Sequence, residues 1–378
     1  MKRIQTCDLF CAVVDNYGDI GIASRLARQL HEEQGLHVRL WVDDLHTFNR
    51  LHPDIAPGAE SQDWQGVEVR RWTSPFAEVV PHDLVIEAFA CELPEAFLQA
   101  MVTRQVKPVW LNLEYLSAEA WVEGCHGLAS PHPRLPLIRY FYFPGYTLGT
   151  GGLLREQGLF ETIEAFQRDG RAQGDFWQQL EVPRPAIGEL RLSLFAYENP
   201  SIASLLDTLA RQPKPVCCLL PESKALAPAL AYFGKDSGRA GACFKHGSLS
   251  LHVLPFLAQD QYDRLLWACD LNIVRGEDSF VRAQFAGRPV VWQAYVQEGD
   301  THAKKVEAWL NRYLDRVSAP LASQVQELYS AWNRGGPLAP AWLESLSDWH
   351  AHAREWARRL AVLPSLSEGL VKFALDKL

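Results

Sequence analysis

The sequence predicts an α/β protein of two domains in tandem, followed by a helical C-terminus. Three observations predict this class. The chain has 378 residues, and a domain commonly takes about 150, so two domains are expected. A buried strand, a turn, a helix and a second strand follow one another at the N-terminus. After a proline-rich break at residues 182–185, a second alternation of apolar strands and helices begins.

The first alternation opens with residues 7–14, a continuous apolar run typical of a strand buried on both faces. A turn at 15–21 leads into an expected helix at 22–34, and residues 37–42 form the next strand. This β-loop-α-β order is the unit of a parallel sheet. The remaining expected elements of this half are strands at 67–72, 84–90 and 108–113 and helices at 93–102 and 117–122.

The second alternation follows an irregular stretch at 124–159 and an expected helix at 161–180. Because the proline-rich break comes next, we expect domains at 1–182 and 183–360, with a terminal helix at 361–378 that packs back on the N-terminal domain. The elements expected after the break are strands at 191–197, 216–220, 250–254, 271–274 and 289–293 and helices at 201–211, 261–268 and 279–286, with a mostly helical remainder from 302.

Composition and charge exclude several classes of protein. The chain has 37 Lys and Arg against 45 Asp and Glu, a net charge of −8, which disfavours a broad nucleic-acid surface. We expect no membrane span, because no run of 18 apolar residues occurs. The basic N-terminus leads into a strand and not a signal peptide. Eight cysteines without a CxxC pair are typical of reduced thiols in a cytoplasmic protein.

The loop at residues 15–21 is the first candidate site, because ligands of open parallel sheets bind beyond the carboxyl ends of the strands. It holds two carboxylates, an amide, a phenol and glycines, but not the GxGxxG spacing of a dinucleotide site. Asp15 and Asp19 can act as acid, base or orienting groups. Alternatively, Asp15 caps a turn and Asp19 caps the helix.

The loop Val274–Ser279 is the second candidate site. Free backbone amides at a helix N-terminus attract anions, and the Arg275 guanidinium offers a fork for phosphate oxygens. Ser279 would add a hydroxyl donor. In the alternative interpretation, Asp278 or Ser279 caps the helix and a surface ion pair forms.

Aromatic residues gather near the same end of the second domain, where a flat base can stack between two rings. For any single ring, core packing is the alternative. No metal site is predicted, since the histidines lack metal-ligand spacing and the pair Asp43–Asp44 favours a helix cap. The aromatic residues of this group are Phe195, Tyr197, Phe256, Tyr262 and Tyr295, with Gln259 and Gln297 nearby.

Six blocks in order give the chain a family resemblance. Together they resemble the bacterial protein-arginine rhamnosyltransferases that modify elongation factor P (the EarP family), and they span nearly the whole chain. The blocks are FCAVVDNYGD at 10–19, the helix at 24–30, LWVDDL at 40–45, FAYEN at 195–199, LPFL at 254–257 and RGEDSFVRAQ at 275–284.

The resemblance implies a GT-B glycosyltransferase, with two Rossmann-like domains facing across a cleft. It implies that the N-terminal domain binds the acceptor protein and the C-terminal domain binds dTDP-β-L-rhamnose. The implied reaction moves L-rhamnose to an arginine of elongation factor P with inversion, in the cytoplasm, and supports translation of polyproline stretches. No metal, other cofactor, nucleic acid or membrane is implied.

The resemblance also implies roles for single residues. Asp19 is the presumed proton acceptor, Asp15 assists it and Glu277 is also needed. Phe195 and Phe256 would bracket the thymine. The remaining implied contacts to the sugar nucleotide are Asn16, Tyr17, Gly18, Tyr197, Gln259, Tyr262, Arg275, Gly276, Asp278, Ser279 and Tyr295.

The chemistry of arginine agrees with a pair of carboxylates. The guanidinium has a pKa above about 12, so a carboxylate cannot remove its proton beforehand. Two carboxylates can hold the guanidinium and accept the proton as the new bond forms. Two alternatives stay open at this point: a GT-B transferase with another acceptor, and a non-catalytic protein that binds a sugar nucleotide.

Overall fold

The computed structural model of this chain describes residues 3–14, 17–295 and 301–378. No helix within this described part is long and apolar enough to cross a membrane. All eight cysteines are free thiols, and only Cys243 is exposed.

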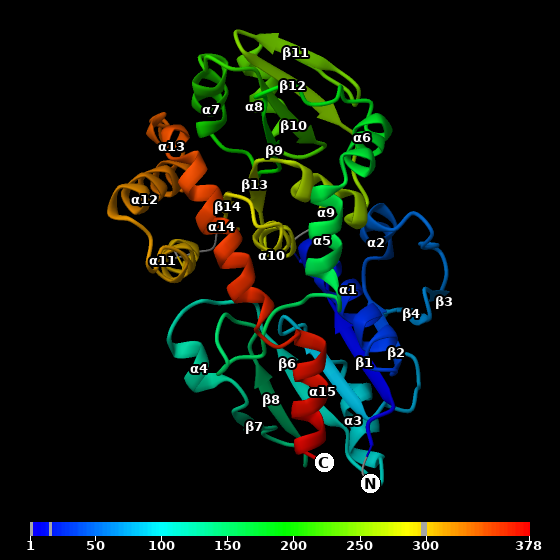
Figure 1. The fold of residues 1–378 in the computed structure, drawn as a ribbon. Helices are drawn as coiled ribbons and strands as arrows, with labels where there is room; N and C mark the ends of the chain where they lie inside the picture. The colour runs from blue at the N-terminus through cyan, green and yellow to red at the C-terminus, as the bar shows by residue number, and fades with distance from the viewer. Residues whose placement is uncertain (1–2, 15–16, 296–300) are drawn as a thin grey trace. The chain divides into compact units, whose positions relative to one another are not determined.

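The chain divides into two compact units, each with a sheet of its own (Figure 1). The first unit comprises residues 1–157 and 363–378, and the second comprises residues 158–362. The chain thus leaves the first unit, completes the second and returns to the first with its last helix. Both sheets are flanked by helices, and the predicted α/β class is confirmed.

The first unit contains a sheet of eight strands in the order β3-β4-β2-β1-β5-β6-β8-β7. Neighbours pair in parallel, except for the antiparallel outer pairs β3 with β4 and β7 with β8. The order of the parallel strands reverses at β1, and ligands of such sheets bind at this reversal. The strands are β1 (Thr6–Cys11), β2 (His37–Val42), β3 (Ser61–Trp64), β4 (Val67–Arg71), β5 (Leu84–Ala88), β6 (Val109–Leu113), β7 (Ala129–Pro131) and β8 (Ile138–Tyr142).

Strand β1 lies at the centre of this sheet and is buried almost throughout. Its one charged residue, Asp8, is 0% exposed. Nε and Nη2 of Arg39, on β2, donate to the two carboxylate oxygens of Asp8 at 2.6 and 2.9 Å. A charge in the core requires such a partner, and the pair therefore fixes β1 against β2.

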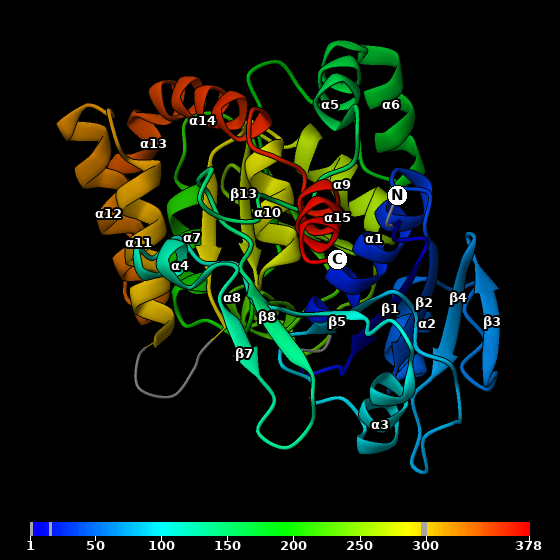
Figure 2. The same cartoon turned by 90° about the horizontal axis from the view of Figure 1, so that it is seen from below.

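Helices cover both faces of the first sheet. Figure 2 shows α3 on one face and α1 with α15 on the other. The apolar side of α3 packs against Phe10, Trp41 and Trp110 of the sheet. The helices of this unit are α1 (Gly18–Glu32), α2 (Leu45–Leu51), α3 (Glu95–Thr103), α4 (Trp121–Cys125) and α15 (Leu366–Asp376).

The second unit contains a sheet of six strands in the order β11-β12-β10-β9-β13-β14. All neighbours are parallel except β11, which runs antiparallel to β12. The order of the parallel strands reverses at β9, as it does at β1 in the first unit. The strands are β9 (Leu190–Leu194), β10 (Val216–Pro221), β11 (Cys243–His246), β12 (Leu249–Leu254), β13 (Leu271–Arg275) and β14 (Val290–Gln293).

Helices also flank the second sheet (Figure 1). Helix α10 follows β13 directly, and its N-terminus therefore lies at the carboxyl edge of the sheet. The helices of this unit are α5 (Leu159–Arg168), α6 (Gly170–Gln179), α7 (Ser201–Ala210), α8 (Leu226–Tyr232), α9 (Gln259–Ala268), α10 (Asp278–Phe285), α11 (Thr301–Tyr313), α12 (Ala319–Arg334), α13 (Ala341–Glu344) and α14 (Leu346–Ala361).

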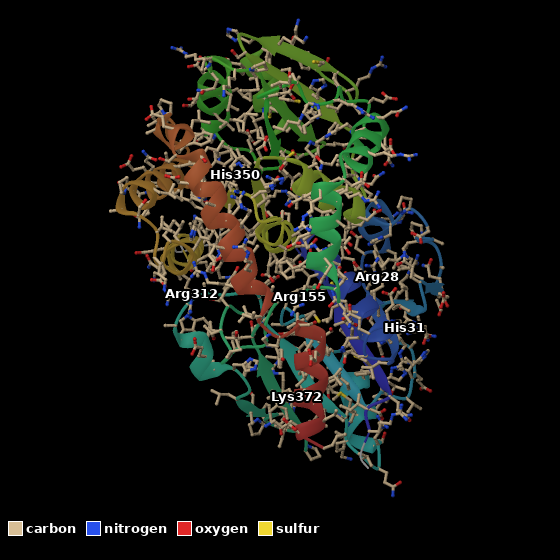
Figure 3. All side chains as sticks on the ribbon, in the orientation of Figure 1. Arg28, His31, Arg155, Arg312, His350 and Lys372 are labelled. Atoms are coloured by element: carbon tan, nitrogen blue, oxygen red, sulfur yellow. The ribbon has the colours of Figure 1, made fainter. Side chains whose placement is uncertain are left out.

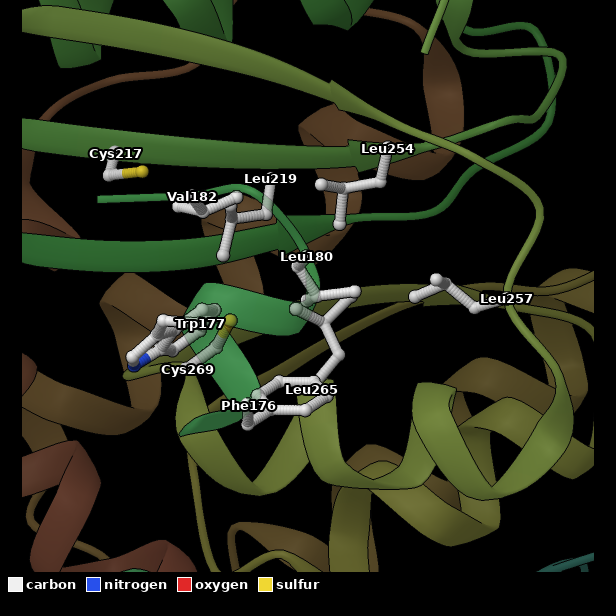
Figure 4. Packing of buried hydrophobic residues seen from close by; sticks show 10 residues of the cluster. All are labelled: Phe176, Trp177, Leu180, Val182, Cys217, Leu219, Leu254, Leu257, Leu265 and Cys269. Atoms are coloured by element: carbon white, nitrogen blue, oxygen red, sulfur yellow. The ribbon is translucent and has the colours of Figure 1, made fainter. Parts of the chain in front are cut away.

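A core cluster explains why residues 158–182 belong to the second unit. Phe176, Trp177 and Leu180 pack with Leu219 of β10 and Leu265 of α9 (Figure 4). These apolar contacts bury one face of the second sheet. The structural division consequently begins at residue 158, whereas the proline-rich break had placed the boundary between residues 182 and 183.

The helix expected at 161–180 is two helices, α5 and α6, and not one. Asp169 separates them, and its Oδ1 accepts the backbone N–H groups of Arg171 and Ala172 at 2.8 and 3.0 Å. This is the geometry of an N-cap. The apolar periodicity of the segment does not show the break, because both helices contribute to the same core.

The last helix, α15, lies in the first unit. Leu370 and Ala374 are buried there. The ring centroid of Phe373 lies 5.5 Å from that of Tyr142 and 5.8 Å from that of Tyr140, both on β8. The helix thus completes the apolar layer on one face of the first sheet.

Candidate functional site

The loop after β1 lies where the strand order of the first unit reverses. Asp15 and Asn16, two of the predicted site residues, lie outside the described residues. Tyr17 is the residue before α1, and Gly18 and Asp19 open the helix. The described part of the loop thus brings an aromatic ring and a carboxylate to the carboxyl end of the central strand.

Asp19 is a buried carboxylate held by two donors. It is 1% exposed. Its Oδ2 accepts the backbone N–H of Val14 at 2.9 Å, and its Oδ1 accepts the hydroxyl of Tyr115 at 3.0 Å. The first turn of a helix also favours a negative charge. The hydrogen bonds from Val14 and Tyr115 therefore give the Asp19 carboxylate a defined orientation.

Tyr115 is a site residue that the sequence analysis missed. It follows β6, and its ring stacks on that of Phe89, which follows β5, with centroids 4.4 Å apart and planes at 13°. Glu114 lies between the end of β6 and Tyr115, and its Oε1 accepts the Asn112 Nδ2–H group at 2.6 Å. Applying the carboxyl-end rule to every strand, and not to β1 alone, would have found this group.

The residues around α2 have supporting roles. The side chain of Asp44 accepts two backbone N–H groups in the first turn of α2, so the helix-cap interpretation of Asp44 is confirmed. Asp43 Oδ1 accepts the backbone N–H of Val13 at 2.9 Å and fixes the end of β1. The guanidinium carbon of Arg50, in the last turn of α2, lies 5.7 Å from the centroid of the Tyr17 ring.

Among the described residues, no three His, Cys, Asp or Glu side chains form a group that would hold a metal ion.

Arg275 is the centre of the second candidate site. It ends β13, and its guanidinium carbon lies 4.7 Å from the ring centroid of Phe195 and 4.6 Å from that of Tyr197. Both rings follow β9, the strand beside β13. Cation–π attraction to two rings restricts the planar guanidinium to one orientation, in which it presents a positive charge at the carboxyl edge of the sheet.

The loop after Arg275 is shaped by a glycine and by hydrogen bonds. Gly276 has φ = +64°, a conformation that side chains with a Cβ rarely adopt. Its carbonyl accepts the indole N–H of Trp292 at 2.7 Å. The Ser279 hydroxyl donates to the Arg275 carbonyl within the loop. The predicted hydroxyl donor is therefore already used internally, and the turn into α10 is defined.

Two acidic residues stand at the start of α10. Glu277 precedes the helix, and its carboxylate accepts no capping hydrogen bond from the described backbone. Asp278 is the first helical residue, and its Oδ2 accepts the Gln259 Nε2–H group at 3.3 Å. Gln259 opens α9, so this contact links the starts of two helices. The alternative in which Asp278 or Ser279 is the N-cap residue does not apply, because that position is Glu277.

The predicted rings form a group around Arg275. The centroids of Phe195 and Tyr262 are 5.2 Å apart, and those of Tyr197 and Tyr295 are 5.7 Å apart. Tyr295 is 48% exposed. Phe256 lies between β12 and α9 and is half-buried, and Gln297 lies outside the described residues. The structure thus brings all the described aromatic candidates to one edge of one sheet.

Tyr262 differs from the other rings because its hydroxyl is buried without a hydrogen-bond partner among the described residues. The ring packs against the core cluster of α6 and α9. Burial raises the pKa of the Tyr262 phenol well above its ordinary value. The side chain therefore behaves as an apolar wall of the site.

Gln293 is a second residue that the sequence analysis did not single out as a site residue. It ends β14, its Oε1 accepts the backbone N–H of Tyr197 at 3.0 Å, and its carbonyl accepts the backbone N–H of Gly276 at 3.3 Å. One side chain and its backbone thereby join the loops after β9 and β13. The sequence feature that could have identified Gln293 is the presence of a glutamine in a buried strand.

Comparison with known proteins assigns the chain to a family. Residues 7–375 match the family model described as elongation factor P (EF-P) rhamnosyltransferase EarP. The chain belongs to this family. It is 50% identical to the protein-arginine rhamnosyltransferase of Pseudomonas aeruginosa over 372 residues, which cover 98% of each chain. Identity to the Pseudomonas putida protein of the same name is 48% over 377 residues, 99% of each chain.

Solved structures place the EarP family chain in the GT-B fold class. A structure described as the structural basis for EarP-mediated arginine glycosylation of EF-P matches with a TM-score of 0.71 and 35% identity, covering 99% of both chains. A UDP-glucosyltransferase of Polygonum tinctorium matches with a TM-score of 0.51 and 10% identity over 99% and 98% of the two chains. The second likeness concerns the fold alone. The GT-B prediction of two Rossmann-like domains is confirmed.

Proposed function

We propose that this chain is an inverting glycosyltransferase that moves L-rhamnose from dTDP-β-L-rhamnose to an arginine side chain of elongation factor P. The observation that carries this proposal is the buried Asp19 carboxylate, held by two donors in the first unit, in a chain that matches the family over residues 7–375. A family of EF-P rhamnosyltransferases requires a proton acceptor for arginine, and Asp19 is suited to that task. The proposed consequence is support for the translation of polyproline stretches in the cytoplasm.

The second unit supplies most of the donor contacts in this proposal. Phe195 and Phe256 bracket the thymine ring of the donor. Arg275 binds the diphosphate with the backbone amides at the start of α10, where the helix dipole favours an anion. The remaining proposed donor contacts are Tyr17, Gly18, Tyr197, Gln259, Tyr262, Gly276, Asp278, Ser279 and Tyr295, with Asn16 outside the described residues.

Inversion requires a single displacement at the anomeric carbon. The arginine nitrogen forms the new N–C bond on one face while the C–O bond to the diphosphate breaks on the other. The guanidinium loses its proton to Asp19 as the N–C bond forms, because its pKa is too high for earlier deprotonation. Asp15, outside the described residues, assists by binding the guanidinium, and Glu277 is also required. The products are rhamnosyl-arginine and dTDP.

Charge develops on the leaving diphosphate, and we assign its stabilisation to Arg275 and the α10 amides. In this mechanism the reaction does not need a divalent metal ion. The initial rate in excess EDTA should equal the rate in magnesium-containing buffer. A rate that EDTA abolishes and magnesium restores would reject this part of the proposal.

Intact mass spectrometry of elongation factor P tests the function as a whole. After incubation with the enzyme and dTDP-rhamnose, the acceptor should gain the mass of one deoxyhexose, and Asp19→Asn should bind the donor without transferring it. Donor binding without any gain of mass would favour a non-catalytic sugar-nucleotide protein. Transfer to a different acceptor only would favour another GT-B enzyme.

A further inference from the structure

We propose that Tyr115 is a positioning residue that orients the Asp19 carboxylate, and that a strained turn at Phe89–Glu92 holds Tyr115 in place. The inference rests on the role of Asp19 as proton acceptor in the proposed function. Its grounds are hydrogen bonds, ring contacts and backbone angles within the first unit.

The two oxygens of Asp19 have different donors. Oδ2 accepts a backbone N–H, that of Val14, at 2.9 Å, and Oδ1 accepts the Tyr115 hydroxyl at 3.0 Å. A backbone donor alone leaves the plane of the carboxylate adjustable. The phenol adds a second fixed direction from another strand end, and it thereby selects which lone pairs face an incoming proton. Preorganisation of this kind accelerates a reaction without direct contact with the substrate.

The ring of Tyr115 is in turn held by a strained turn. Phe89, Ala90 and Glu92 have φ values of +58°, +54° and +48°. Such angles are unfavourable for residues with a Cβ, and several within four residues persist only where the surroundings enforce them. The turn places the Phe89 ring parallel to the Tyr115 ring, with centroids 4.4 Å apart. The strained turn therefore holds the Phe89 ring against the Tyr115 ring.

Hydrogen bonds to β6 enforce the turn. The backbone N–H of Phe89 donates to the Leu113 carbonyl at 2.7 Å. The N–H of Ala90 donates to Asn112 Oδ1 at 3.3 Å. Both acceptors belong to β6, the strand that leads directly to Tyr115. Both ends of the stacked pair are thus tied to the same strand.

Glu87 lies on β5, shortly before the turn. It is 1% exposed, and it accepts the Trp110 indole N–H at 3.0 Å and the Arg139 Nη1–H at 3.2 Å. Glu87 and Glu92 line a cavity of about 390 Å³. Because one side of the turn borders this open space, hydrogen bonds rather than close packing hold it there.

Tyr115→Phe removes the hydroxyl and keeps the stacked ring. We expect kcat for transfer to elongation factor P to fall about tenfold, the effect of losing one hydrogen bond to a charged group. The KM for dTDP-rhamnose should change less than about twofold.

Tyr140→Phe is the matched control, since the ring of Tyr140, on β8, packs beside that of Phe373 of α15. It should keep the parent kcat and KM. Phe89→Tyr keeps the stacked ring and should keep the rate. Phe89→Gly relieves the unfavourable backbone angle but removes the ring, and it should lower kcat at least about threefold with a similarly small change in KM.

The result that would overturn the inference is a Tyr115→Phe enzyme with the parent kcat. Loss of activity in proportion to loss of folded protein, with kcat per folded enzyme unchanged, would also overturn it, since that is a purely structural effect. Asp19→Asn separates this inference from the proposed function. If Asp19→Asn transfers rhamnose normally, the proposed function of Asp19 fails; if it is inactive while Tyr115→Phe is normal, only the positioning inference fails.

Discussion

At the residue scale, Tyr262 leads to a prediction about stability. Its hydroxyl is buried without a partner among the described residues, and such a group costs about 1–3 kcal/mol. Tyr262→Phe should therefore raise the free energy of unfolding by about 1 kcal/mol, with donor affinity within about twofold of the parent. Urea unfolding and calorimetry with dTDP-rhamnose measure the two quantities.

The control for Tyr262 is Tyr313→Phe, which removes a buried hydroxyl that has a partner. The Tyr313 hydroxyl accepts the Trp349 indole N–H at 2.9 Å, and its loss leaves that group unpaired. We expect destabilisation by about 1–3 kcal/mol in this variant. A Tyr262→Phe protein that binds the donor tenfold more weakly would contradict the apolar role of Tyr262 and indicate a hydrogen bond to the donor.

Arg275 leads to a prediction about affinity. The ammonium group of lysine is not planar, so it cannot pack its face against aromatic rings, and it cannot bind a diphosphate through two parallel N–H groups. Arg275→Lys should weaken dTDP-rhamnose binding about tenfold or more in calorimetry. Arg264→Lys, on the exposed side of α9, makes the same chemical change as a control and should bind normally. Unchanged affinity in Arg275→Lys would mean that Arg275 does not contact the donor.

The sequence predicted these site residues only in part. Asp19 and Arg275 were identifiable because each stands in a short polar loop directly after an apolar strand. Tyr115 was not, because its hydrogen bond to Asp19 joins residues that are 96 positions apart, and a single sequence shows no such pairing. The hydrogen bond that the Ser279 hydroxyl donates within its own loop was not predicted either, because such a bond depends on the geometry of the turn.

At the element scale, the predicted strands of both parallel sheets are present, but the edge strands β3, β7 and β11, and β8 beside β7, were missed. Central parallel strands are continuous apolar runs. Three of the missed strands, β3, β7 and β11, are short and half-exposed, so their composition resembles that of loops. The boundary between α5 and α6 was missed for a different reason: the Asp169 cap is a local contact inside a segment with continuous helical periodicity.

Helix α14 leads to a prediction about pH dependence. His350 lies on this helix (Figure 3), where burial, together with Arg288 and Arg354, lowers the pKa of its imidazole from 6.5 to about 4. As the pH falls, the unfolded chain takes up this proton before the folded protein does. The stabilising contribution is therefore complete above pH 6.5 and is lost as the pH falls toward about 4.

His350→Asn removes this titration. The urea midpoint of the parent should fall more steeply between about pH 7 and pH 4.5 than that of His350→Asn, because the variant lacks the differential proton uptake. His246→Asn, at an exposed position on β11, removes one histidine elsewhere in the same unit as a control. Parallel curves for the parent and His350→Asn would show that His350 does not contribute to acid sensitivity.

At the scale of the whole molecule, the position of the division between units was the feature least accessible from the sequence. Prolines at residues 183 and 185 mark a sharp break in the chain, but a break need not be a domain boundary. Which sheet a helix covers depends on which apolar face has room for it, and the faces of the two sheets have similar compositions. Phe166 of α5 and Trp177 of α6 thus pack in the second unit, in a cluster with residues of β10, β12 and α9.

The return of the chain to the first unit leads to the last prediction. Leu370 of α15 is 0% exposed, and replacing a buried leucine by alanine typically costs about 2–5 kcal/mol. Because each unit has its own core, Leu370→Ala should lower the urea concentration at which the first unit unfolds, while the second unit keeps its own transition. Leu375→Ala, at a position that is 43% exposed, should leave both transitions close to those of the parent.

The two proposed sites make this separation measurable by function. In Leu370→Ala, transfer to elongation factor P should fail at a urea concentration where dTDP-rhamnose still binds, because most of the proposed donor residues, Arg275 among them, belong to the second unit and Asp19 belongs to the first. Calorimetry and intact mass, taken across one urea series, give both quantities. If donor binding and transfer fail together in this variant, the two units unfold as one cooperative body, and the stabilising effect of α15 extends over the whole chain.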